Sequence, residues 1–195
     1  RFKAIDFKVG KGASRWMPLY INGFREGKKY FPNKRVLIFS SGSVLKALDM
    51  DFQNILWQLT LDYEIVGTPV MDLEAGFIYA KGRAEESLRF DHKVFAIKMD
   101  GSLHGHVKID MANLISEGGT AFKNPVPRIQ CKTAMGINKN VQPKNVFFGC
   151  SVATIPGNPN SQYGSEKGIR GSVITVELDK NGLLTNKVRA FLTSA

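Results

Sequence analysis

The chain has 195 residues and a net charge of +10, from 27 lysines and arginines against 17 aspartates and glutamates. Its hydrophobic content of 43% is enough for a buried core and excludes a wholly disordered chain. Two cysteines are too few for a disulfide-rich scaffold or for a zinc site made of cysteine pairs.

The positive charge is concentrated near the beginning of the sequence. Residues 1–35 hold ten lysines and arginines against two acidic residues, Asp6 and Glu26. Such a segment suits an acidic partner surface, nucleic acid or anionic lipid, or it forms a set of solvated loops. No recognised nucleic-acid-binding motif accompanies the charge, so we expect no specific nucleic-acid partner.

Short apolar runs separated by turn residues recur along the chain, and helical periodicity is nearly absent. The run from Val36 to Phe39, which ends before Ser41 and Gly42, is typical. No run approaches the roughly 20 residues that a membrane-spanning helix needs, so we expect no transmembrane segment. These patterns predict an all-β fold. The predicted strands are 36–40, 44–48, 55–59, 65–71, 77–80, 93–98, 104–109, 145–150, 171–178 and 186–192.

An internal repeat organises these strands. Ala4, Ala47, Ala96 and Val176 occupy equivalent positions in four similar segments, spaced 43, 49 and 80 residues apart. A period of about 45 residues with four short strands is typical of a β-propeller built from four-stranded antiparallel blades. We therefore predict one partial β-propeller domain over residues 1–195, with about three and a half blades. The approximate blade units are 1–20, 21–62, 63–110 and 111–195.

An open arc of blades would expose sheet edges and apolar faces to water. We therefore expect the remaining blades to come from a longer polypeptide or from another protein chain.

One motif carries a resemblance to a known family. Ala47, Asp49 and Trp57 have the spacing of the tryptophan-docking motif of quinoprotein β-propellers, and the chain resembles the pyrroloquinoline-quinone (PQQ) dehydrogenase-like superfamily. In physical terms, a small Ala lets an indole ring approach the backbone of a neighbouring unit, and the Asp accepts hydrogen bonds from turn amides. The motif is therefore predicted to dock blades rather than to carry out chemistry. Looser copies are Ala4, Asp6 and Trp16, and Ala96 and His106, where His replaces Trp.

The resemblance implies two functions. The first is a binding or scaffold module, similar to non-catalytic members such as the propeller lipoprotein of outer-membrane assembly. The alternative is part of a PQQ-dependent alcohol or sugar dehydrogenase, which would hold PQQ and calcium. The chain lacks the adjacent cysteine pair of many such dehydrogenases, and no catalytic or cofactor-binding residue can be assigned, which favours the first function. A periplasmic or extracellular location is also implied.

The cysteines and histidines each leave two alternatives. Cys131 and Cys150 lie symmetrically about the predicted turn at 138–144, so they are cross-strand neighbours that form either a disulfide or two packed thiols. His104 and His106 lie two apart on one predicted strand and would share a face, where His92 could join them around a metal. We favour the structural interpretation, in which His106 takes a docking position and no metal binds.

The segment 155–164 is the candidate binding loop. It is rich in Pro, Gly and Asn, which predicts irregular structure, and loops on a rigid scaffold often carry binding. The alternative is a surface insertion without a binding role. The candidate contact residues are Asn158, Asn160, Gln162, Tyr163 and Arg170.

Overall fold

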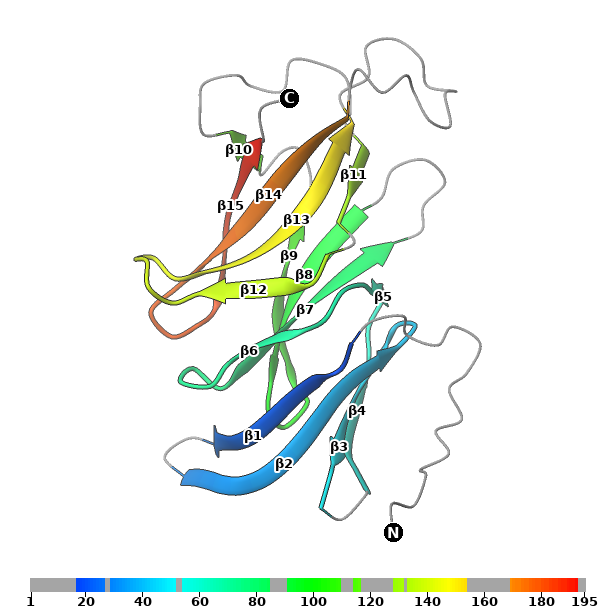
Figure 1. Cartoon of the computed structure of the whole chain (residues 1–195), viewed down its shortest axis with the longest axis vertical. Coiled ribbons are helices and arrows are strands. Elements are labelled where there is room, and N and C mark those ends of the chain that lie inside the picture. The colour runs from blue at the N-terminus through cyan, green and yellow to red at the C-terminus, as the bar shows by residue number, and fades with distance from the viewer. Residues whose placement is uncertain are drawn as a thin grey trace.

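The computed structural model of the chain describes residues 17–26, 29–51, 54–84, 91–109, 114–116, 128–131, 133–153 and 169–192. The described residues form fifteen strands and no helix, so the fold is all-β as predicted. No helix long and apolar enough for a membrane span occurs in this part of the chain. The strands make three sheets, which follow one another along the long axis of the molecule (Figure 1).

The first sheet is a four-stranded antiparallel meander in which neighbours in sequence are neighbours in space. Its second and third strands match the predicted segments 36–40 and 44–48, whereas its first strand was not predicted. The strands are β1 (Leu19–Glu26), β2 (Lys29–Ser41), β3 (Val44–Asp49) and β4 (Asn54–Thr60).

The second sheet also follows chain order, but its first strand is in two pieces. The predicted strand 65–71 is split into β5 and β6, which both pair with β7. The chain between them approaches the third sheet instead, where Met135 N donates a hydrogen bond to Thr68 O over 3.3 Å. The strands are β5 (Glu64–Ile65), β6 (Val70–Asp72), β7 (Phe77–Ala84), β8 (Asp91–Lys98) and β9 (Leu103–Ile109).

The third sheet repeats this plan and adds one strand. Both β11 and β12 pair with β13, antiparallel pairing continues through β14 to β15, and the short β10 adds to β15 in parallel. The three short strands β10, β11 and β12 were not predicted. The strands are β10 (Leu114–Ser116), β11 (Arg128–Gln130), β12 (Met135–Asn138), β13 (Asn145–Ala153), β14 (Ile169–Leu178) and β15 (Leu184–Leu192).

Two apolar cores lie between the sheets and join them face to face. One core contains Ile38 and Ala47 of the first sheet together with Phe95 and Ile97 of the second. The other contains Ala96 of the second sheet and a larger group from the third. That group is Cys131, Val146, Phe148, Cys150, Ile174, Val176, Leu178, Val188 and Ala190.

The middle position of the second sheet explains its sequence. Side chains alternate between the two faces of a strand, so a strand covered on both faces needs a continuous apolar run. The run 94–97 on β8 meets this need, because Val94 and Ala96 enter one core while Phe95 and Ile97 enter the other. Among the described residues, each outer sheet contributes to one of these two cores only.

Candidate functional site

The best-defined contact between the first two sheets is made by Trp57 on β4. Its Nε1 donates a hydrogen bond to Met99 O, 2.7 Å away, at the end of β8. Its ring lies on Gly101, because a Cβ added to that glycine would meet Trp57 Cγ and Cδ2 at 2.7 Å. Gly101 also has a φ of +87°, in the region that favours glycine. A turn glycine and an indole ring therefore fit together across the interface.

The other residues of this motif, Ala47 and Asp49, lie on β3, the strand that pairs with β4. Ala47 is the direct cross-strand partner of Trp57 and is fully buried. The Asp49 carboxylate, at the end of the same strand, accepts a hydrogen bond from Asp51 N over 2.9 Å. Asp100 plays the same part in the next sheet, where its Oδ1 accepts from Ser102 N over 2.8 Å. The earlier copy, Ala4, Asp6 and Trp16, lies outside the described residues.

His106 does not stand where Trp57 stands. In the second sheet the cross-strand partner of Ala96 is Gly105, whereas His106 pairs with Phe95 and is exposed. In both motifs the aromatic residue follows the alanine by ten residues. However, the connection from Ile97 to its cross-strand partner Leu103 is one residue shorter than the connection from Leu48 to its partner Ile55. A slip of one residue reverses the face of a side chain. The expectation that His106 occupies a docking position therefore needs this correction.

The histidines also do not gather around a metal. The ring of His104 lies 5.3 Å from that of Phe77, and the ring of His106 lies 6.0 Å from that of Phe95. Phe77 and Phe95 belong to different cores, so the two histidines lie on opposite faces of the sheet rather than on one. The fully buried His92 accepts a hydrogen bond from Cys131 N at 3.4 Å. Among the described residues, no group of His, Cys, Asp and Glu could hold a metal ion.

A second turn glycine links the second and third sheets. Tyr79 Oη donates a hydrogen bond to Gly182 O over 2.6 Å. Gly182 has a φ of +82°, and a Cβ there would lie 2.5 Å from Ala75 Cβ. Burial raises the pKa of the Tyr79 phenol, and the carboxylate of Asp72 raises it further. Sequence reasoning missed Tyr79, although the Gly182 turn itself was visible as Lys180-Asn181-Gly182.

A buried carboxylate strengthens the same interface. Asp72, which is fully buried, lies 3.0 Å from Lys139 Nζ and 3.8 Å from Lys144 Nζ, both at the turn between β12 and β13. Burial alone would raise the pKa of this carboxyl, but hydrogen bonds from Lys139 and from the amides of Ala75 and Glu74 outweigh it and lower the pKa. The two sheets are therefore joined by charge as well as by apolar packing.

The most unusual buried group is Lys81 on β7. Its side chain is fully buried, and its Nζ donates a hydrogen bond to Thr133 O over 2.9 Å. The same nitrogen lies 4.6 Å from the centre of the Phe148 ring. Burial lowers the pKa of this amine to about 7. We assign the amine a structural role, because the side chain is not exposed to solvent.

The two cysteines form a disulfide beside this lysine's interface. Cys131 and Cys150 are joined, with their Cα atoms 4.1 Å apart, and both side chains lie in the core between the second and third sheets. Cys131 follows β11, and Cys150 lies within β13, so the bond continues the antiparallel pairing of these strands. It links two segments that are 19 residues apart in the sequence.

Removing this disulfide is expected to lower the free energy of unfolding by about 3 kcal/mol, from the size of the loop that it closes. The test variant is the double substitution Cys131→Ala/Cys150→Ala, measured by urea denaturation. Wild-type protein denatured with a reductant is the control and should lose a similar amount. Equal stability of the oxidised wild type and the double variant would contradict a stabilising role.

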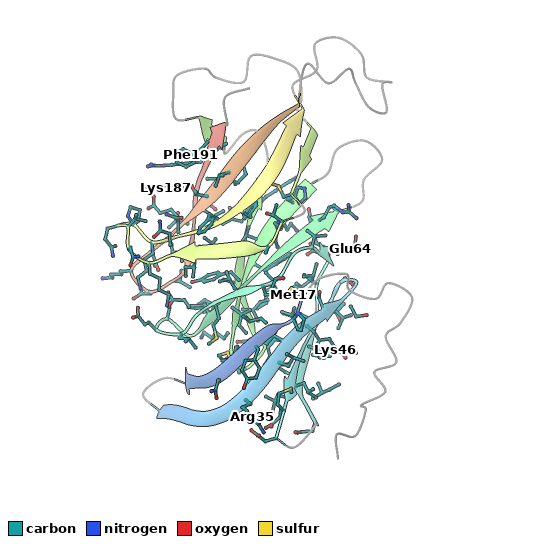
Figure 2. The ribbon with its side chains drawn as sticks, viewed as in Figure 1. Met17, Arg35, Lys46, Glu64, Lys187 and Phe191 are labelled. Atoms are coloured by element: carbon teal, nitrogen blue, oxygen red, sulfur yellow. A yellow bond between two sulfur atoms is a disulfide. The ribbon has the colours of Figure 1, made fainter. Side chains whose placement is uncertain are left out.

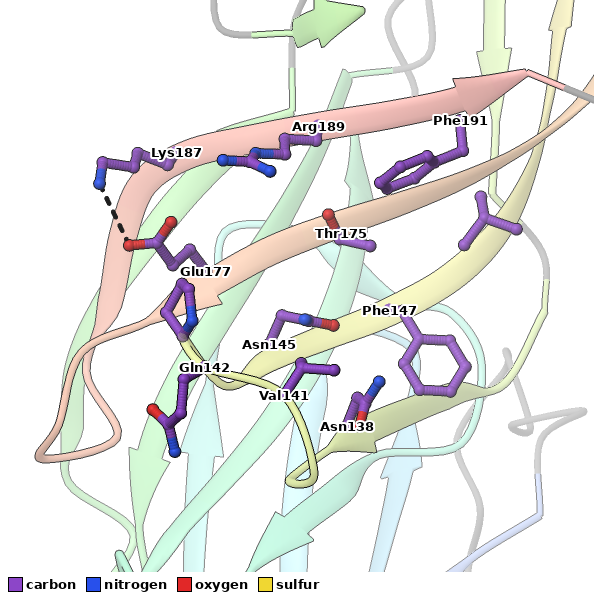
Figure 3. Close-up of a pocket in the computed structure, with 12 residues that line it drawn as sticks. Asn138, Val141, Gln142, Asn145, Phe147, Thr175, Glu177, Lys187, Arg189 and Phe191 are labelled. Carbon is purple, nitrogen blue, oxygen red and sulfur yellow. Dashed lines mark hydrogen bonds and ion pairs between the residues drawn. The ribbon is translucent and has the colours of Figure 1, made fainter. Parts of the chain in front are cut away.

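A hollow lies on the face of the third sheet that is turned away from the second sheet. It encloses about 600 Å³ and combines apolar with polar side chains (Figure 3). Phe147, Val173 and Phe191 are 39%, 38% and 39% exposed in it. Glu177 and Lys187 form an ion pair of 3.2 Å at its polar end. The remaining lining residues are Asn138, Val141, Gln142, Pro143, Asn145, Thr175 and Arg189.

The structure does not describe most of the candidate binding loop. Asn158, Asn160, Gln162 and Tyr163 lie outside the described residues, and Arg170 lies at the beginning of β14. Sequence reasoning missed the hollow because its residues come from four strands and one turn. Comparison of the chain with protein-family models, with curated proteins and with solved structures finds no match.

Proposed function

We propose that the chain is a segment of a quinoprotein-like β-propeller that acts as a binding or scaffold module. The docking of Trp57 on the Gly101 turn carries this proposal, because a ring on the last strand of one unit contacts the turn before the last strand of the next unit. The face-to-face stacking of the three sheets is what successive blades require. On this proposal the three sheets are blades, and further blades complete the ring.

The proposal includes an oxidising location, periplasmic or extracellular. The disulfide between Cys131 and Cys150 supports it, because such bonds persist mainly in secreted and periplasmic proteins. A scaffold role is supported by the way the motif residues are used: Ala47 and Trp57 pack, and Asp49 binds a turn amide.

Titration with PQQ in the presence of calcium tests the scaffold role against the dehydrogenase alternative. We expect no saturable binding by calorimetry and no change in the quinone absorbance on addition of the protein. A PQQ-dependent dehydrogenase in the same buffer is the positive control. Stoichiometric binding of the quinone would overturn the scaffold role and favour the alcohol or sugar dehydrogenase.

A further inference from the structure

In the part of the chain that the structure describes, the stack of three sheets ends in two outer faces, one on the first sheet and one on the third. The outer face of the first sheet carries an apolar row across all four strands, because Tyr20 pairs with Leu37, Leu37 with Leu48, and Leu48 with Ile55. Leu48 is buried, whereas Tyr20 and Ile55 at the two ends of the row are 52% and 49% exposed. Beside this row lies Lys46, which shares the face.

The outer face of the third sheet is the hollow described above. On this face Val173 pairs with Gly149 on one side and with Phe191 on the other, which makes an apolar row across three strands. The next row places Thr175 between Phe147 and Arg189. Figure 2 shows Lys46 on the first sheet and Phe191 on the third, towards opposite ends of the stack.

The stack has a direction, and the two outer faces are of opposite type. The face of the first sheet with Ala47 and Trp57 packs on the second sheet, and the face of the second sheet with Ala96 packs on the third. In the third sheet the matching positions are Glu177 and Lys187, which lie on its outer face. The outer face of the third sheet is therefore equivalent to the faces that pack on the following sheet. The outer face of the first sheet is equivalent to the faces on which a preceding sheet packs.

The equivalence of Ala47, Ala96 and Glu177 follows from the strand registers. It corrects the repeat alignment of the sequence, which gave this position to Val176. Lys46, Phe95 and Val176 have the cross-strand partners Gln58, His106 and Val188 in the row that faces the preceding unit. One residue later on the third strand come Ala47, Ala96 and Glu177. One residue earlier on the last strand come Trp57, Gly105 and Lys187.

Charges on the two outer faces suit one another at these positions. If the first sheet of another copy packed on the third sheet as the second sheet packs on the first, Lys46 and its partner Gln58 would lie against Glu177. Asp49 at the end of β3 and Asp51 in the following turn would come against Lys187, as the Gly101 turn comes against Trp57. In the two interior interfaces the corresponding positions hold uncharged side chains, Ala47 and Ala96 against Phe95 and Val176. The charges thus distinguish this pairing from the interior ones.

We propose that a second copy of this chain packs head to tail on the first, with the outer face of its first sheet on the outer face of the third sheet. This inference rests on the proposed blade-like stacking. The described residues of each copy present one face of each type, so two copies cover these four faces and form a ring with two identical interfaces. Each interface pairs Glu177 of one copy with Lys46 of the other.

The test measures the mass of the chain in solution by light scattering and sedimentation over a range of concentrations. We expect a species of about twice the 21.6 kDa of one chain. Lys46→Glu and Glu177→Lys each put like charges at both interfaces and should weaken association at least about tenfold. An equimolar mixture of the two variants should associate again, because each interface then joins opposite charges. Lys180→Glu, at an exposed turn of the third sheet, is the matched control and should associate like wild type.

Each outcome decides the proposal. A wild-type chain that stays monomeric at high concentration, or that grows into open-ended polymers, would overturn it. Single variants that associate as tightly as wild type, or a mixture that fails to associate, would overturn the head-to-tail arrangement. None of these results bears on quinone binding, so failure of this inference is distinguishable from failure of the scaffold role.

Discussion

Replacing Gly101 with alanine is expected to lower the free energy of unfolding by roughly 3 kcal/mol, measured by urea denaturation. Two effects add. An alanine at a φ of +87° is strained, which costs about 1 kcal/mol or more, and its Cβ would meet Trp57 at 2.7 Å, well inside van der Waals contact. The ring cannot easily withdraw, because Trp57 Nε1 is held by Met99 O.

Gly42 provides the matched control for this substitution. It also has a positive φ, +59°, but a Cβ there would meet nothing within 4 Å. Gly42→Ala therefore measures backbone strain alone, about 1–2 kcal/mol. In a Trp57→Ala background the cost of Gly101→Ala should fall to a similar value, since the ring atoms are gone. Additive effects of the two substitutions would show that the ring and the glycine are not in energetic contact.

The first two sheets show what a sequence of this kind can predict. Strands 36–40 and 44–48 were visible because apolar runs ended at glycine and polar turns, and β2 and β3 contain them. The strand 65–71 was predicted as continuous, but its middle residues bond to the third sheet, which no local pattern reveals. The short strands β10, β11 and β12 carry too few residues for a periodic signal.

Errors in the candidate contacts have a physical cause as well. Counting ten residues from Ala96 gave His106 the place of Trp57. The pairing of Ile97 with Leu103 spans one residue fewer than that of Leu48 with Ile55, so Gly105 is opposite Ala96 instead. Hydrogen-bond partners in distant segments of the chain could not be predicted from the sequence. The hydrogen bond from Tyr79 spans 103 residues and that from Lys81 spans 52, so neither polar group could be assigned a buried role from its neighbours in sequence.

Lys81 leads to the second large prediction, a rise in stability between pH 7 and 9.5. In the unfolded chain its amine keeps a usual pKa of 10.5, whereas burial lowers the pKa in the folded protein to about 7. Between these values the unfolded chain binds one more proton, so the free energy of unfolding increases with pH. Below pH 7 the amine is protonated in both the folded and the unfolded chain. The cost of burying the charge is then fully present, and the contribution of Lys81 to the free energy of unfolding does not change with pH. The expected gain from pH 7 to 9.5 is about 3 kcal/mol, from 1.36 kcal/mol for each pH unit.

The slope of stability against pH is the sharper measurement, because a substitution at Lys81 changes more than charge. Lys81→Met removes the burial cost but also leaves Thr133 O without its hydrogen bond, a loss of about 1–3 kcal/mol that offsets part of the gain at pH 7. The methionine variant should therefore show a much flatter profile whatever its absolute stability. Lys98→Met, an exposed lysine on the neighbouring β8, controls for the loss of one positive charge and should keep the wild-type slope. If wild type and Lys81→Met have the same slope, the amine is not held in a desolvated position between the second and third sheets.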